Sequence, residues 1–102
     1  MDSSEDAVAI APDVHKVISE DHGVRILEVK LKAGAKAEMH WHPENVSYVI
    51  AGGKMKVTKQ DGTSAEVELT PGQVINGVDG YHEVENIGTS NIQTIQIEYL
   101  EK

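Results

Sequence analysis

The sequence predicts an all-β domain, in the form of a β-sandwich, a jelly roll or a small barrel. From Val24 onwards the chain consists of short runs rich in Val and Ile, separated by turn residues such as Gly, Asp and Asn. Strands at a spacing of about 8–12 residues, without a long helix, are typical of these architectures. The composition agrees, because the chain has no Phe and its Val and Ile together outnumber Leu and Met. β-Branched residues favour strands.

The length of 102 residues predicts a single domain. Its first residues are small, acidic and polar, and Pro12 follows them. We therefore expect residues 1–13 to form a flexible acidic tail and residues 14–102 to form one folded domain.

Six runs are predicted to be strands of one sheet system, because each combines β-branched residues with flanking turn residues. Hairpins are expected at Gly52-Gly53 and at Asp61-Gly62. The predicted strands are VRILEVKL (24–31), KAEMHWH (36–42), VSYVI (46–50), KMKVTK (54–59), SAEVEL (64–69) and IQTIQIEY (92–99).

Alternation gives the last predicted strand two different faces. Ile95, Ile97 and Tyr99 lie on one face, and the polar side chains of Gln96 and its neighbours at positions 94 and 98 lie on the other. The pattern does not show which face lines the interior.

Charge and composition exclude several classes of partner. Nine basic residues against 17 acidic residues give a net charge of −8, and Arg25 is the only arginine. Such a chain is unsuited to tracking phosphates or an acidic membrane surface, so we expect neither a nucleic-acid nor a membrane partner. We expect Arg25 to be a solvated surface charge. The absence of cysteine leaves the compartment open. The N-terminus lacks the basic region of a signal peptide, and no apolar stretch approaches about 18 residues, so we expect a cytoplasmic protein.

Two of the five histidines share one face of a predicted strand. His40 and His42 flank Trp41 in an extended run, and side chains two residues apart point to the same side of a sheet. Two adjacent imidazoles supply half of a coordination shell for Zn, Ni, Cu or Fe. The alternative is a pair of histidines on a solvated sheet face. His15 and His22 lie in polar surroundings, and we expect both on the surface.

The residues around this histidine pair resemble the first motif of the cupin family. That motif places a Gly before His-x-His and another Gly after it, and here Gly34 and AKAEM precede His40-Trp41-His42, while Gly52 or Gly53 follows. A later stretch from Gly72 to Asn86 resembles the second cupin motif and contains His82.

This resemblance covers the chain from Val14 to its end and implies a cupin-type double-stranded β-helix, which is a jelly-roll barrel. Two segments, HPENVSYVIAGGKMKV and VELTPGQV, look like the small single-domain bacterial cupins grouped with β-alanine degradation. The resemblance also implies a homodimer built partly from the N-terminal strands near Val17 and Ile26. Pairing of exposed strand edges is one physical reason to expect such a dimer.

The same resemblance implies one divalent metal ion, held by His40, His42 and His82. The carboxylate of the first motif has no counterpart, because neither Asn45 nor Val46 is acidic. We expect Asn45 to occupy that position and to offer a neutral carbonyl oxygen, which is a weak ligand. Zn, Ni, Fe, Mn and Cu all remain candidates.

Two functions remain open at this point. The first is a metal-binding cupin that acts on or binds a small polar molecule in the barrel, as an enzyme of small-molecule catabolism would. The second is a ligand-binding or sensor cupin whose metal is structural or absent. The loss of the motif carboxylate favours three histidines with water, as in an open zinc site, over an oxygen-activating iron site. Whether the protein is an enzyme is left undecided by its residues.

Overall fold

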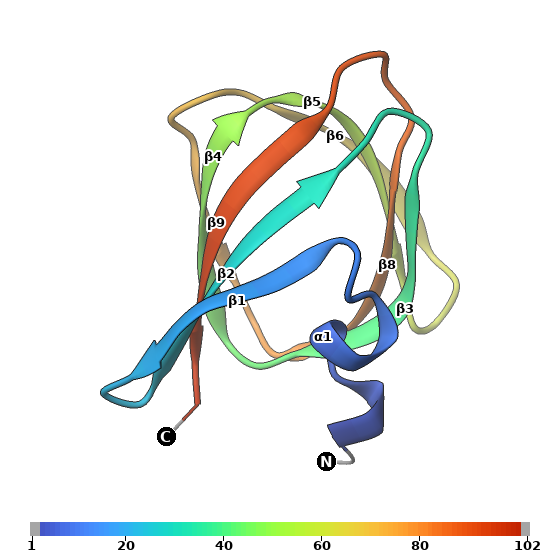
Figure 1. Cartoon of the computed structure of the whole chain (residues 1–102). Helices are drawn as coiled ribbons and strands as arrows, with labels where there is room; N and C mark the ends of the chain where they lie inside the picture. Colours follow the sequence, from blue (N-terminus) through green and yellow to red (C-terminus); the bar gives the residue numbers. More distant parts are fainter. Residues whose placement is uncertain (1–2, 101–102) are drawn as a thin grey trace.

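The computed structural model describes residues 3–100, which form a barrel of antiparallel strands with two short helical segments at its N-terminal end (Figure 1). The predicted all-β jelly roll is confirmed. The elements are η1 (Ser3–Glu5), α1 (Ala7–Ile10), β1 (His15–Asp21), β2 (Val24–Leu31), β3 (Lys36–His42), β4 (Asn45–Ala51), β5 (Gly53–Lys59), β6 (Ser64–Leu69), β7 (Val74–Gly77), β8 (Gly80–Asn86) and β9 (Ile92–Tyr99).

Two sheets enclose the interior. One has the strand order β1-β2-β9-β4-β7, and the other has the order β3-β8-β5-β6. Their inward-facing side chains include the apolar core, of which Leu31, Val49, Leu69 and Ile92 are fully or almost fully buried. Ala37 of β3 and Val84 of β8 belong to this core, and the same two strands also carry buried or partly buried histidines further along.

Most of the predicted strands have the predicted bounds, but one predicted hairpin is wrong. The turn at Asp61-Gly62 does join the paired strands β5 and β6. The residues Gly52-Gly53 do not form a hairpin, because β4 and β5 belong to different sheets and the chain crosses between the sheets at this point. A turn sequence between two strands indicates a change of direction, but it does not show which strand pairs with which.

Gly52 is required at this crossing because of a close backbone approach. A Cβ atom on Gly52 would lie 2.1 Å from the carbonyl oxygen of Leu69 and 2.9 Å from its carbonyl carbon. Neither atom can move without shifting β6. We expect Gly52→Ala to destabilise the fold by about 3 kcal/mol, the upper part of the usual range for overpacking. Urea unfolding followed by circular dichroism measures this change in stability. Equal stability of the Gly52 variant and the wild type would contradict it.

The N-terminal segment differs from the flexible tail that the sequence predicts. Residues 3–10 form η1 and α1, and Ala7 is fully buried against the barrel. The Asp6 side chain caps α1 by accepting a hydrogen bond of 3.0 Å from the Val8 amide. Small residues and an N-cap allow this short segment to pack closely. Met1 and Asp2 lie outside the described residues, and the domain boundary at residue 14 remains a prediction.

Within residues 3–100, no helix has the length and hydrophobicity needed to cross a bilayer.

Candidate metal centre

His40 and His42 point into the barrel from β3, as their spacing predicts. Both are buried, whereas the intervening Trp41 is only partly buried on the other face of the strand. The centroids of the two imidazole rings are 4.8 Å apart. The alternative of a solvated histidine pair is therefore wrong.

His82 joins this pair from the neighbouring strand. It lies on β8 directly opposite His40, so the two side chains share one face of the sheet. The His82 ring centroid is 4.7 Å from that of His40 and 5.1 Å from that of His42. The three histidines that the family resemblance implies are thus adjacent.

His15 is a fourth member of the cluster, and its predicted surface position is wrong. Only 3% of His15 is exposed, and its ring centroid lies 4.9 Å from that of His40 and 5.2 Å from that of His42. It is the first residue of β1 and pairs with Val29 of β2, whose side chain lines the interior. His22, by contrast, is on the surface as predicted, with 89% of its side chain exposed.

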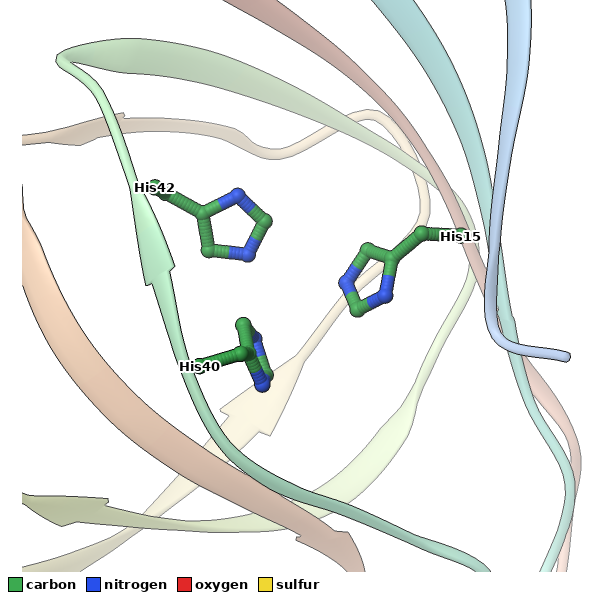
Figure 2. A group of neighbouring side chains, drawn as sticks. All are labelled: His15, His40 and His42. Atoms are coloured by element: carbon green, nitrogen blue, oxygen red, sulfur yellow. The ribbon is translucent and has the colours of Figure 1, made fainter. Parts of the chain in front are cut away.

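The side chains of His15, His40 and His42 converge from β1 and β3 on one point (Figure 2). One nitrogen from each of the three side chains lies within 4.8 Å of the others. This group could hold a metal ion.

The hydrogen bonds of these three histidines leave one nitrogen of each available. Nδ1 of His40 is 2.6 Å from the carbonyl oxygen of Glu38, and Nδ1 of His15 is 3.2 Å from that of Ala11. Nδ1 of His42 contacts a carboxylate oxygen of Glu98. Because carbonyl and carboxylate oxygens only accept hydrogen bonds, each Nδ1 carries the proton and each Nε2 has a free lone pair.

His40 gives the clearest indication that the cluster could bind a metal ion. Within the described residues, its buried Nε2 atom has no hydrogen-bond partner. A buried polar atom without a partner is costly, and a bound metal ion would remove that cost. The residues present therefore fit a metal ion.

Burial keeps these histidines neutral. Desolvation, strengthened by repulsion from neighbouring imidazoles, lowers the pKa of His15, His42 and His82 to about 3. Burial also lowers the pKa of His40. Metal binding requires the unprotonated imidazole, so the cluster is in its binding form at neutral pH.

Glu98 is a buried carboxylate that the sequence analysis did not assign to the site. It lies on β9, is fully buried and accepts a hydrogen bond of 2.7 Å from Nε of Arg25. Its other carboxylate oxygen contacts His42. Burial raises the pKa of Glu98, and the neighbouring Arg25 opposes that rise. The alternation of β9 contained the signal, since Glu98 shares its inward face with Thr94 and Gln96.

Arg25 is not the solvated charge that its isolation in the sequence suggests. Only 14% of its side chain is exposed, and it forms ion pairs with both Glu98 and Asp6. The distance from its Nη2 atom to Oδ1 of Asp6 is 2.9 Å. Arg25 thus connects the buried carboxylate of Glu98 with the mostly buried carboxylate of Asp6.

Asn45 faces the interior, as the predicted register requires. It is buried and lines the cavity together with Ser47, while Tyr48 on the opposite face is half-exposed. The side-chain nitrogen of Asn45 donates a hydrogen bond of 2.8 Å to the carbonyl oxygen of Pro43. Asn45 also lies directly opposite Glu98 in the sheet. Its role as a metal ligand remains a prediction.

A cavity of about 1010 Å³ opens beside the histidines. His15, His42 and His82 form part of its wall. Most of the remaining wall is apolar, including Met55 and Val57, which pack against the core. The cavity therefore combines a nitrogen-rich polar end with an apolar body, as small-molecule sites commonly do.

Comparisons with known proteins identify the fold. No protein-family model and no curated protein match the chain. A cupin domain from Bordetella pertussis Tohama I has a TM-score of 0.76 and 22% identity, covering 83% of this chain and 90% of that one. A double-stranded β-helix domain protein from Klebsiella pneumoniae has a TM-score of 0.69 and 16% identity, over 85% of this chain and 76% of that one.

A cupin superfamily protein from Desulfitobacterium hafniense is similar in the same way, with a TM-score of 0.64 and 14% identity, over 86% of this chain and 77% of that one. Likeness at this level of identity establishes the fold, so the chain has the cupin double-stranded β-helix. The finer resemblance to the β-alanine degradation group is not confirmed.

Proposed function

We propose that this cupin-fold protein binds one divalent transition-metal ion through His15, His40 and His42, with His82 beside them, and takes a small molecule into the adjoining cavity. The observation that carries the proposal is the buried Nε2 atom of His40, for which the described residues provide no hydrogen-bond partner. The fixed Nδ1 protons of all three histidines support it, because they leave each Nε2 free to bind.

The donor set favours zinc, nickel, copper or iron over harder ions. Imidazole suits these metals, whereas Mg²⁺ and Mn²⁺ prefer carboxylates, carbonyls and water. Three neutral ligands would leave the ion with its full positive charge and open positions. A bound metal of this kind supplies a Lewis acid that polarises a ligand oxygen. The cavity would then accept a small molecule with a polar, preferably anionic, group at the histidines and an apolar part against Met55 and Val57.

One observation favours a ligand-binding or sensor protein as the second candidate. Glu98 is the carboxylate that contacts the histidine cluster, and it is already engaged by Arg25 and His42. It is not free to accept a proton from a substrate, so the general base that a hydrolytic enzyme needs is not supplied by this residue.

Elemental analysis of protein purified without an affinity tag tests the proposal. We expect about one zinc, nickel, copper or iron ion for each chain. Thermal-shift screening of the metal-loaded protein with small carboxylates and amino acids then tests ligand binding, and turnover of any ligand found separates the enzyme from the sensor. Protein that stays metal-free after incubation with each of these ions would overturn the proposal.

We also expect a homodimer, because the outer face of the five-stranded sheet carries an apolar patch. Ile26, Ile97 and Val46 lie side by side across three strands, on the face opposite the cavity. Tyr48 and Val74 extend this face and are 50% and 57% exposed. Exposed apolar surface of this kind favours association between copies of the chain. Light scattering at micromolar concentration should give the mass of a dimer, and Ile97→Lys should give a monomer. A monomeric wild type would contradict this prediction.

A further inference from the structure

The segment of residues 6–11, here called the N-terminal clasp, lies directly on the strand that carries His40 and His42. Figure 1 shows α1 beside β3 at one end of the barrel. Asp6 forms a parallel β-bridge with Trp41, the residue between the two histidines. Ala7 is fully buried in the same contact region. The clasp is thus packed against the strand that carries two of the candidate ligands.

A chain of charged contacts connects the clasp to His42. Asp6 accepts a hydrogen bond of 2.9 Å from Nη2 of Arg25, and Nε of Arg25 donates one of 2.7 Å to Glu98. The second oxygen of Glu98 accepts the Nδ1 proton of His42. These four side chains come from the N-terminal segment, β2, β9 and β3, and all are buried or mostly buried. Charged hydrogen bonds in such surroundings are strong and only weakly screened.

A second contact connects the clasp to His15. Ala11 is the C-cap of α1, and its carbonyl oxygen is 3.2 Å from Nδ1 of His15. The same carbonyl accepts a hydrogen bond of 3.0 Å from the His15 amide. The position of Ala11 therefore sets both the backbone and the ring of this histidine.

We propose that the N-terminal clasp positions His15 and His42 for metal binding, so that docking of the clasp and binding of the metal stabilise each other. The proposal rests on the proposed function, since it concerns the same metal centre. Asp6, Arg25 and Glu98 are positioning residues: they fix the proton and the ring orientation of His42 and raise the basicity of its free nitrogen. Coupling between two binding events is reciprocal, so each must affect the other by the same factor.

Asp6→Asn is the most direct test of the charged chain. Asparagine caps a helix about as well as aspartate, so α1 keeps its N-cap while the charge that balances Arg25 is removed. Arg25 then interacts more strongly with Glu98. As a result, Glu98 becomes a weaker hydrogen-bond acceptor for Nδ1 of His42. We expect the affinity for Zn²⁺, measured by competition with a chelator, to fall about 10-fold, the lower end of the range for losing a partner behind a metal ligand. The Asp6→Glu variant keeps the negative charge and should therefore retain most of the wild-type affinity for Zn²⁺.

Asp13→Asn is the matched control, because it removes the same charge from an exposed position in the same region. Its Zn²⁺ affinity should equal that of the wild type. The visible spectrum of the Co²⁺-loaded protein adds a readout that a change in stability alone does not move. We expect the bands to shift in Asp6→Asn and in Glu98→Gln, and to stay unchanged in Asp13→Asn.

Hydrogen exchange tests the reciprocal effect on the clasp itself. The amides of Ala9, Ile10 and Ala11 donate hydrogen bonds within α1 and its cap. Saturating Zn²⁺ should slow their exchange by at least about 10-fold, because opening the clasp breaks the contacts of both Asp6 and Ala11, whereas Asp6→Asn weakens only one of them. The amide of Gly72, in the turn between β6 and β7, should be unaffected.

The outcomes separate the two proposals. Wild-type protein that binds none of the metals overturns the proposed function. Wild-type protein that binds Zn²⁺ tightly, with unchanged affinity in Asp6→Asn and unchanged exchange in α1, overturns the clasp alone. Circular dichroism of each variant shows whether it is folded, and Glu98→Gln supplies an independent break in the same chain of contacts should Asp6→Asn unfold.

Discussion

Replacing His40 with alanine is expected to lower the affinity for Zn²⁺ by more than about 100-fold, which exceeds the usual loss from removing a partner behind a ligand. His40 is at the centre of the cluster: its ring is within 5 Å of the rings of His15, His42 and His82. Its Nε2 atom is buried and has no hydrogen-bond partner among the described residues. Isothermal titration calorimetry measures the affinity, and His40→Gln serves if the alanine variant is unstable.

His22→Ala is the control for this experiment, because it removes an exposed imidazole. Its Zn²⁺ affinity should equal that of the wild type. His15→Ala and His82→Ala should each weaken binding, since both rings flank the central pair. Full affinity in His82→Ala would remove that residue from the site, and full affinity in His40→Ala would refute the site as a whole.

The metal-free protein is expected to lose several kcal/mol of stability between pH 7 and pH 5. The pKa of His15, His42 and His82 lies near 3 in the folded protein, against an ordinary value of 6.5. Below about pH 6.5 the unfolded chain therefore binds more protons than the folded protein does. The free energy of unfolding is highest above pH 6.5 and decreases as the pH falls towards 3. Each histidine contributes about 2 kcal/mol over the interval from pH 7 to pH 5. The sum is a large part of the 5–15 kcal/mol that is typical of a domain.

Urea unfolding at pH 7, 6 and 5 measures this dependence. His42→Gln removes one of the buried titrating groups and should reduce the slope by at most about a third, because the lowered pKa of His40 contributes to it as well. A wild-type free energy of unfolding that is the same at pH 7 and pH 5 would show that these histidines are not held neutral by burial.

The strands were predictable because their signal is local. Alternation and turn residues place β2, β3, β6 and β9 at their observed bounds. The strands β1, β7 and β8 are not among the six predicted runs. β1 has Val17 and Ile18 adjacent to each other, β7 has only four residues, and β8 has a single β-branched residue, Val84. The pairing of strands is not local, which is why Gly52-Gly53 looks like a hairpin although it joins two sheets.

Part of the site could be predicted from spacing, and part depends on tertiary pairing. His40 and His42 share a face by strand geometry, and the second motif points to His82. His15 lacks such a pattern, because its inward direction follows from its pairing with β2. Glu98 was hidden for a related reason: the polar face of β9 lines the interior and its apolar face points outward, the reverse of the usual expectation for a half-exposed strand.

Anomalous diffraction from crystals grown with Zn²⁺ shows directly which residues hold the metal ion. Data collected on both sides of the zinc absorption edge locate the metal without reference to any assumed ligand. We expect one strong site inside the barrel, with the Nε2 atoms of His15, His40 and His42 at about 2.0–2.1 Å, the usual zinc–imidazole distance. Zinc bound only at acidic side chains on the surface, with the histidine cluster empty, would contradict it.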